Sequence, residues 1–155
     1  MKPNSKLVAL KSLLILFSAA LFSFSAKKGG DSFEVWLNGK RVLQQYVHVT
    51  KGVQTLHLAQ TSAKDRLDVY YNHCGQTGKS RFITIKDGKD RPLKVWKFND
   101  ATGNNVAMSF TLKDVLSLKK NKADKLSLYY SSRELPEGRL LAIIDSENET
   151  GIARK

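Results

Sequence analysis

The sequence contains a single cysteine, Cys74, and only three prolines among its 155 residues. One thiol cannot form an internal disulfide, so a hydrophobic core must hold the fold together. Cys74 belongs neither to a Cys-x-x-Cys motif nor to a Cys-x-x-Cys-His motif. Dithiol redox chemistry and covalent haem attachment are therefore excluded.

Motifs of the common enzyme classes are also missing. The chain has no Gly-x-Ser-x-Gly, no His-Glu-x-x-His, no phosphate-binding P-loop and no dinucleotide fingerprint. Asp65 and Asp68 lie three residues apart in a strand-like segment, so they face opposite sides and do not form a glycosidase pair. The Asp87–Asp90 segment lacks the ligand pattern of a calcium loop. We expect a non-catalytic protein without a cofactor.

The N-terminal segment has the pattern of an export signal. Three lysines and no acidic residue open the chain, and residues 12–26 carry no charge. Ser23-Phe24-Ser25 supplies a small-x-small exit, so residues 1–25 are expected to be a secretory signal peptide cleaved before Ala26. The alternative is a permanent anchor, but the uncharged run falls short of the ~20 residues that a spanning helix needs. We expect a secreted or periplasmic protein with no transmembrane anchor after cleavage.

The remaining chain is basic. Removal of residues 1–25 takes away three lysines and no acidic residue, which leaves 23 basic against 14 acidic residues, a net charge of +9. Such an excess favours contact with a polysaccharide or with an anionic envelope surface, although it can also serve solubility alone. Export argues against a nucleic-acid partner. The densest basic stretch runs from Lys79 to Lys97.

Alternating apolar and polar residues predict an all-β domain. Asn38-Gly39 is the typical two-residue turn of a β-hairpin, and Lys51-Gly52 is expected to join segments 42–49 and 53–58 in the same way. Thr111 resembles the start of a capping box, which predicts one short helix near residues 112–120. A turn is expected at Pro136-Glu137-Gly138, before an apolar strand over 139–144 that is central in its sheet.

Three segments recur in the same order with nearly constant spacing. Residues 33–36 resemble 93–96, residues 65–71 resemble 124–130, and residues 81–87 resemble 139–145. This pattern predicts a β-sandwich or jelly-roll-like domain over 26–146. The domain should consist of two similar four-strand units, over 33–87 and 93–145, with about eight strands in total. A flexible polar tail is expected over 147–155. The alternative is that these segments resemble each other only because strands in general favour the same few residue types.

The repeat also predicts which side chains face outward. Val35 and Val95 should face the core, and so should Tyr71 and Tyr130. Outward aromatic rings beside polar groups are typical of surfaces that stack sugar rings, unless loops or a bulge cover them. The candidate binding residues are Trp36, Trp96, Tyr70, Tyr129, Arg66 and Lys94.

Two alternative functions rest on histidine and cysteine. Cys74 is a candidate reactive thiol for a small secreted enzyme, although His73 is its neighbour in a strand end and should point away from it. His48 and His57 would be diagonal neighbours if Lys51-Gly52 forms a tight turn, which makes His48, His57 and His73 weak candidates for a metal site. The leading hypothesis remains an exported, non-catalytic binding or structural module.

Overall fold

A computed structural model of the chain describes residues 30–49, 52–58, 64–103, 105–121 and 123–145. The expected signal peptide over 1–25 and the expected tail over 147–155 lie outside these residues. No helix in the described ranges has the length and the apolar character needed to cross a membrane.

The described chain forms nine β-strands and one short helix. In chain order they are β1 (Ser32–Leu37), β2 (Lys40–Tyr46), β3 (Gln54–His57), β4 (Arg66–Asn72), β5 (Arg81–Lys86), β6 (Pro92–Phe98), β7 (Met108–Thr111), α2 (Leu112–Leu116), β8 (Leu126–Ser132) and β9 (Leu135–Asp145).

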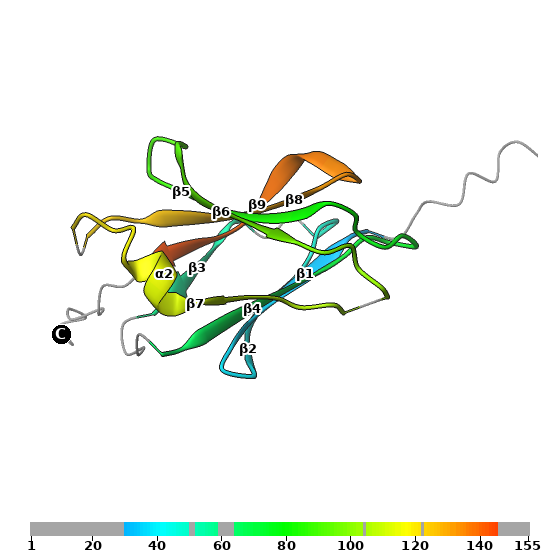
Figure 1. The fold of residues 1–155 in the computed structure, drawn as a ribbon, viewed down its shortest axis with the longest axis horizontal. Helices are drawn as coiled ribbons and strands as arrows, with labels where there is room; N and C mark the ends of the chain where they lie inside the picture. The colour runs from blue at the N-terminus through cyan, green and yellow to red at the C-terminus, as the bar shows by residue number, and fades with distance from the viewer. Residues whose placement is uncertain (1–29, 50–51, 59–63, 104, 122, 146–155) are drawn as a thin grey trace, which may run out of the picture.

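The strands form two sheets that pack against each other as an all-β sandwich. One sheet has four strands in the order β2-β1-β4-β7, and the other has five in the order β3-β9-β8-β5-β6. Figure 1 shows them as two layers, with β5, β6, β8 and β9 above β1, β2, β4 and β7. Paired strands in the described part are antiparallel except β3 and β9, which run parallel. The predicted fold class is confirmed.

The core lies between the two sheets. Its buried side chains come from both sheets and from α2, and they form one cluster that includes Val35, Val69, Met108, Ile83, Leu128, Ile144 and Leu112. Each of these side chains belongs to the apolar half of an alternating strand or to the helix face that caps the sandwich. Burial of a Val, Leu or Ile side chain stabilises the fold by about 1.5–3 kcal/mol.

Local turn and cap chemistry follows the sequence closely. Asn38 and Gly39 have φ angles of 52° and 79°, which is the left-handed conformation that a two-residue hairpin turn requires. The hydroxyl of Thr111 accepts a hydrogen bond from the backbone N–H of Asp114 at 3.3 Å and so caps α2. The helix ends at Leu116, which makes it shorter than the predicted 112–120.

The predicted hairpin between segments 42–49 and 53–58 is wrong. β2 pairs with β1, whereas β3 lies in the other sheet and pairs with β9. The physical reason is that β9 is an apolar strand and therefore takes an interior position in its sheet, with β3 on one side and β8 on the other. The prediction that 139–144 is central in its sheet is therefore confirmed.

The predicted turn at Pro136-Glu137-Gly138 is also wrong. β9 begins at Leu135, which pairs with Ser132, so the turn between β8 and β9 is Arg133-Glu134. Gly138 instead has a positive φ of 72° next to an irregularity in the β8–β9 register. Glycine suits this position because a strand bulge often needs the left-handed conformation.

The repeated segments do not form one sheet each. The four-stranded sheet combines β1, β2 and β4 with β7, and the five-stranded sheet combines β3 and β5 with β6, β8 and β9. β4 and β8 do occupy similar places, because each is an interior strand whose equivalent residues are buried or half-buried alike, except that Asp68 is buried and Ser127 is half-buried. β1 and β6 do not, because β1 is an interior strand and β6 is an edge.

The orientation predicted for β6 is reversed. Val95 is 54% exposed, whereas Trp96 is half-buried and stacks on Phe110 of β7, with 4.8 Å between ring centroids. The cause is the register with β5, which places Trp96 opposite Ile83, a fully buried core residue. The larger ring thus closes the edge of the sandwich, and the smaller Val95 faces solvent.

Candidate binding surface

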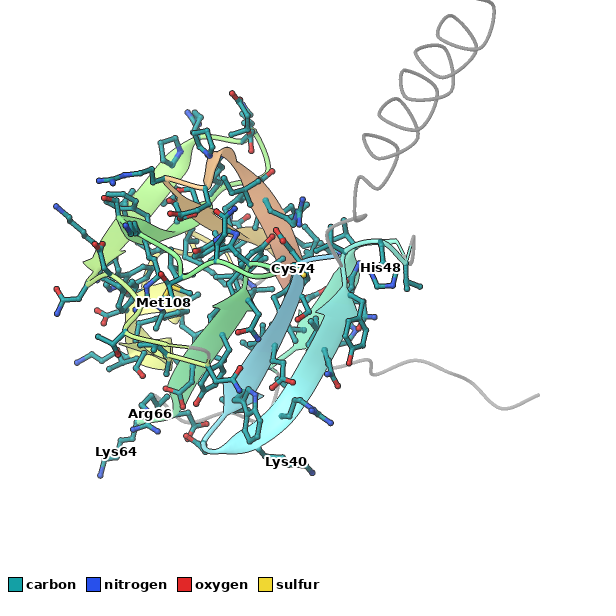
Figure 2. All side chains as sticks on the ribbon, turned by 90° about the vertical axis from the view of Figure 1, so that its right-hand side faces the viewer. Lys40, His48, Lys64, Arg66, Cys74 and Met108 are labelled. Carbon is teal, nitrogen blue, oxygen red and sulfur yellow. The ribbon has the colours of Figure 1, made fainter. Side chains whose placement is uncertain are left out.

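The outer side of the four-stranded sheet carries polar and aromatic side chains. We call this surface the aromatic face and define it by Glu34, Trp36, Arg41, Gln44, Tyr46, Arg66, Asp68, Tyr70 and Ser109. The strand register brings Glu34 opposite Gln44 and Tyr70, and it brings Trp36 opposite Arg41 and Asp68. Figure 2 shows β2, β1 and β4 side by side, with Lys40 and Arg66 toward one end of the strands and His48 and Cys74 toward the other.

Trp36 and Tyr70 form an aromatic pair at the centre of this face. Their rings meet edge to face, with 5.9 Å between centroids and an interplanar angle of 63°. The indole N–H of Trp36 donates a hydrogen bond of 2.7 Å to Glu34, and Arg41 donates to the other oxygen of that carboxylate at 3.1 Å. The carboxylate of Glu34 therefore fixes the orientation of an indole that stays partly exposed.

Asp68 is buried although it lies on the outer side of its strand. Only 3% of the residue is exposed, and its carboxylate accepts hydrogen bonds from Arg66 at 3.2 Å and from Ser109 at 2.5 Å. A buried carboxylate needs such partners to offset the loss of hydration. Asp68 therefore anchors Arg66 beside the aromatic pair.

The six predicted binding residues do not form one surface. Trp36, Tyr70 and Arg66 share the aromatic face, whereas Tyr129 lies on the outer side of the five-stranded sheet under the ammonium group of Lys86, 4.1 Å from its ring centroid. The remaining two residues, Trp96 and Lys94, lie at the edge of the core and contact β7 and α2.

Lys94 and Trp96 help to close the sandwich. Lys94 donates a hydrogen bond of 2.9 Å to Asp114 of α2 and lies 4.9 Å from the ring centroid of Trp96. The Lys94 ammonium, together with the hydroxyl of Thr111, lowers the pKa of the Asp114 carboxyl below its ordinary value. This contact joins β6 to the helix and leaves neither side chain on the aromatic face.

Cys74 and His73 occupy different environments. Cys74 is exposed, whereas His73 is 8% exposed, with its Nε2 atom 3.0 Å from the hydroxyl of Tyr130 and 3.1 Å from that of Ser132. Both ring nitrogens face other polar groups of the protein, since Nδ1 lies 3.6 Å from the half-buried carboxylate of Asp31. The imidazole is thus engaged in the core and not with the neighbouring thiol.

A polar cluster between the two sheets was missed in the sequence. We call it the polar junction and define it by Asp31, Tyr71, His73, Tyr130, Ser132 and Arg139. Tyr71 donates a hydrogen bond to Asp31 at 2.8 Å and accepts one from Arg139 at 2.6 Å. Burial, reinforced by the contact with Asp31, raises the pKa of Tyr71 well above its usual range. The sequence carries two signals of this cluster: Tyr71 and Tyr130 are predicted to face the core, and His73 and Ser132 are separated by the repeat spacing of the Tyr-Tyr segments.

Asp31, His73 and Ser132 have the order of a hydrolytic triad, carboxylate to imidazole to hydroxyl. Ser132 is only 5% exposed, however, and the His73 nitrogen is shared with Tyr130. A nucleophile must reach a substrate, so the burial of this hydroxyl favours a structural role. The junction ties β4 to β8 and β9 across the core.

The pairing that suggested a metal site is absent. His48 follows β2 of the four-stranded sheet, and His57 ends β3 of the five-stranded sheet. Within the described ranges, no group of three or more His, Cys, Asp or Glu side chains could hold a metal ion.

No protein-family model matches the chain, and no curated protein matches it. The function must therefore be argued from the surface itself.

Proposed function

We propose that this protein is a non-catalytic binding module that acts outside the cytoplasm and holds a polysaccharide on the aromatic face. The observation that carries the proposal is the pair of Trp36 and Tyr70, two partly exposed rings oriented by the carboxylate of Glu34. Sugar rings present an apolar C–H side that packs on an aromatic ring, while their hydroxyls need hydrogen-bonding partners at its edges.

The neighbours of the aromatic pair supply such partners. Arg41 and Gln44 are exposed, and Arg66 is exposed at the end of β4. Guanidinium and amide groups donate hydrogen bonds in fixed directions, which suits the recognition of hydroxyl or carboxylate groups on a sugar. The strands hold these groups in register, so little ordering would accompany binding.

Charge and export support the same proposal. A net charge of +9 beyond residue 25 would attract acidic polysaccharides over a range set by the salt concentration. The basic and apolar start of the chain has the pattern of a secretory signal, which would deliver the protein to a compartment where polysaccharides are exposed.

The proposal is tested by affinity electrophoresis of the purified protein through gels that contain neutral or acidic polysaccharides. Trp36→Ala and Tyr70→Ala should each weaken retardation by at least about tenfold, since central aromatic contacts contribute about 2 kcal/mol or more. The matched control is Tyr129→Ala, which removes a partly exposed aromatic ring from the other sheet.

Two results would count against a polysaccharide site on this face. One is migration of the unmodified protein that no tested polysaccharide changes. The other is an equal loss of retardation in Trp36→Ala and Tyr129→Ala, which would place binding elsewhere or reduce it to net charge. Near-ultraviolet circular dichroism of each variant checks that the fold is retained.

A further inference from the structure

A pocket at the α2 end of the sandwich lies apart from the aromatic face. It has a volume of about 510 Å³ and lies between the β5–β6 turn, residues 87–91, and the described parts of the loop from α2 to β8, residues 117–121 and 123–125. Figure 1 shows both segments at the same end of the molecule. This volume is within the range of about 300–1,000 Å³ typical of small-molecule sites.

The pocket wall has basic and apolar parts. Lys89 comes from the β5–β6 turn and Lys120 from the opposite loop, while Leu93, Leu118 and Leu126 supply apolar surface. Neither Lys89 nor Lys120 forms a salt bridge with another described residue. Two lysines from separate segments thus line one pocket without an ion-pair partner among the described residues.

The acidic residues of the wall are already occupied. Asp87 accepts hydrogen bonds from the side chain of Arg91 at 2.8 Å and from the backbone N–H groups of Arg91 and Lys89 at 3.0 Å and 2.9 Å. The Arg91 contacts hold the pKa of Asp87 at about 2. The carboxylate therefore organises the turn that carries Lys89 and does not compete for the pocket lysines.

Asp124 organises the opposite wall in the same way. It accepts hydrogen bonds from the backbone N–H groups of Asn121 at 2.9 Å and of Lys120 at 3.0 Å, and these contacts lower its pKa. Both loops are thus shaped by internal carboxylates before any ligand arrives. A preformed wall reduces the ordering cost of binding.

We infer that this pocket binds a small organic anion that carries a phosphate or carboxylate group on one side and an apolar surface on the other. The anionic group would contact Lys89 and Lys120, and the apolar part would pack on Leu93, Leu118 and Leu126. Both kinds of contact are needed, because exposed ion pairs alone are weak. The site is independent of the polysaccharide surface.

The test is a two-dimensional NMR titration of the purified ¹⁵N-labelled protein at low salt. Phenyl phosphate and benzoate represent the phosphate and carboxylate forms, inorganic phosphate lacks the apolar part, and benzyl alcohol lacks the charge. We expect saturable shifts of the amides of residues 88–91, 93, 118–121 and 123–126 with the organic anion of the preferred class. Inorganic phosphate and benzyl alcohol should bind more weakly, and the stronger of the two organic anions identifies the anionic group.

The variant Lys89→Gln/Lys120→Gln should weaken this binding by about tenfold, since it removes both charged contacts to the anion. The matched control is Lys40→Gln/Lys79→Gln, which removes the same charge from two exposed lysines elsewhere and should leave the affinity within about twofold. Trp36→Ala should bind normally, which separates this site from the aromatic face.

Any of three results would overturn the inference. The first is the absence of saturable shifts with either organic anion. The second is equal weakening by the two double-lysine variants, which would reduce the effect to net charge. The third is inorganic phosphate binding as tightly as phenyl phosphate, which would show that Leu93, Leu118 and Leu126 do not contribute to binding.

Discussion

Tyr71 and Tyr130 stack across the core, with 4.2 Å between ring centroids and an interplanar angle of 13°. They hold equivalent positions in the two Asp-basic-Leu-x-aliphatic-Tyr-Tyr segments, 59 residues apart. His73 and Ser132 have the same separation and also meet, 3.1 Å apart. Equivalent positions of the repeated segment therefore face each other across the core, between β4 of one sheet and β8 of the other. The polar junction thus links the two sheets.

The hydroxyl of Tyr130 should contribute measurably to this link. Tyr130→Phe keeps the ring stack but removes the group that lies 3.0 Å from Nε2 of His73. We expect the free energy of unfolding to fall by about 1–2 kcal/mol, measured by urea denaturation. Tyr70→Phe, on the outer side of the neighbouring sheet, should change it by less than about 0.5 kcal/mol. An equal effect of the two substitutions would contradict a specific role for the junction.

His73 should matter for stability, and Cys74 should not. His73→Ala leaves a cavity and removes the partner of Tyr130, Ser132 and Asp31, so a loss of about 2–4 kcal/mol is expected in the same assay. Cys74→Ala alters an exposed side chain and should stay within about 0.5 kcal/mol. If Cys74→Ala were the more destabilising variant, the assignment of His73 to the core would be wrong.

Features set by neighbouring residues could be predicted from the sequence. The Asn38-Gly39 turn, the Thr111 cap and the opposite directions of Tyr70 and Tyr71 each depend on φ preferences or on the two-residue period of a strand. For the same reason, Trp36 was correctly placed on an outer side.

Features set by long-range pairing could not be predicted from the sequence. The parallel pairing of β3 with β9 depends on a neighbour more than eighty residues away, and the direction of Trp96 depends on its register with Ile83. Asp31, Tyr71 and Arg139 are distant in sequence, so no local pattern connects them. The similarity of 33–36 to 93–96 was misleading because an interior and an edge strand can share residues while facing opposite ways.

The polar junction should make the protein sensitive to alkaline pH. Burial raises the pKa of both Tyr71 and Tyr130 above the ordinary value of 10.0. At a pH above 10.0 the tyrosines of the unfolded chain lose protons that those of the folded chain keep. The free energy of unfolding should therefore be maintained at lower pH and should fall as the pH rises beyond 10.0.

This loss is measured by urea denaturation at roughly pH 9 and about pH 11. The comparison with Tyr71→Phe isolates the contribution of Tyr71 from that of all other groups. The variant should be less stable at pH 9 but should lose less stability on the change to pH 11. An unchanged loss in the variant would show that Tyr71 does not carry the dependence.

The β5–β6 turn should respond to acid. The contacts of Asp87 with Arg91 lower its pKa from 3.8 to about 2, so its contribution to stability is present above 3.8 and is lost as the pH falls toward 2. Asp87→Asn should therefore show a smaller decline in the free energy of unfolding than the unmodified protein across this interval. Glu137→Gln removes an exposed carboxylate in a different place and serves as the control. Identical declines in Asp87→Asn and the unmodified protein would contradict the assignment.

Gly78 gives the last and most specific test, because it packs against the junction. A Cβ atom at this position would lie 2.8 Å from the hydroxyl oxygen of Tyr130 and 3.1 Å from Cδ of Arg81. Tyr130 is fully buried and stacked on Tyr71, so its ring cannot move away without disturbing the core. Gly78→Ala should lower the free energy of unfolding by about 1–3 kcal/mol, as overpacking does elsewhere.

The matched control for this substitution is Gly88→Ala. A Cβ atom at Gly88 meets nothing within 4 Å, so the change in stability should remain within about 0.5 kcal/mol. Combining Gly78→Ala with Tyr130→Phe should cost less than the sum of the single variants, because the clash involves the hydroxyl that the second substitution removes. Additive losses would show that the strain at Gly78 arises from Arg81 or the backbone and not from Tyr130.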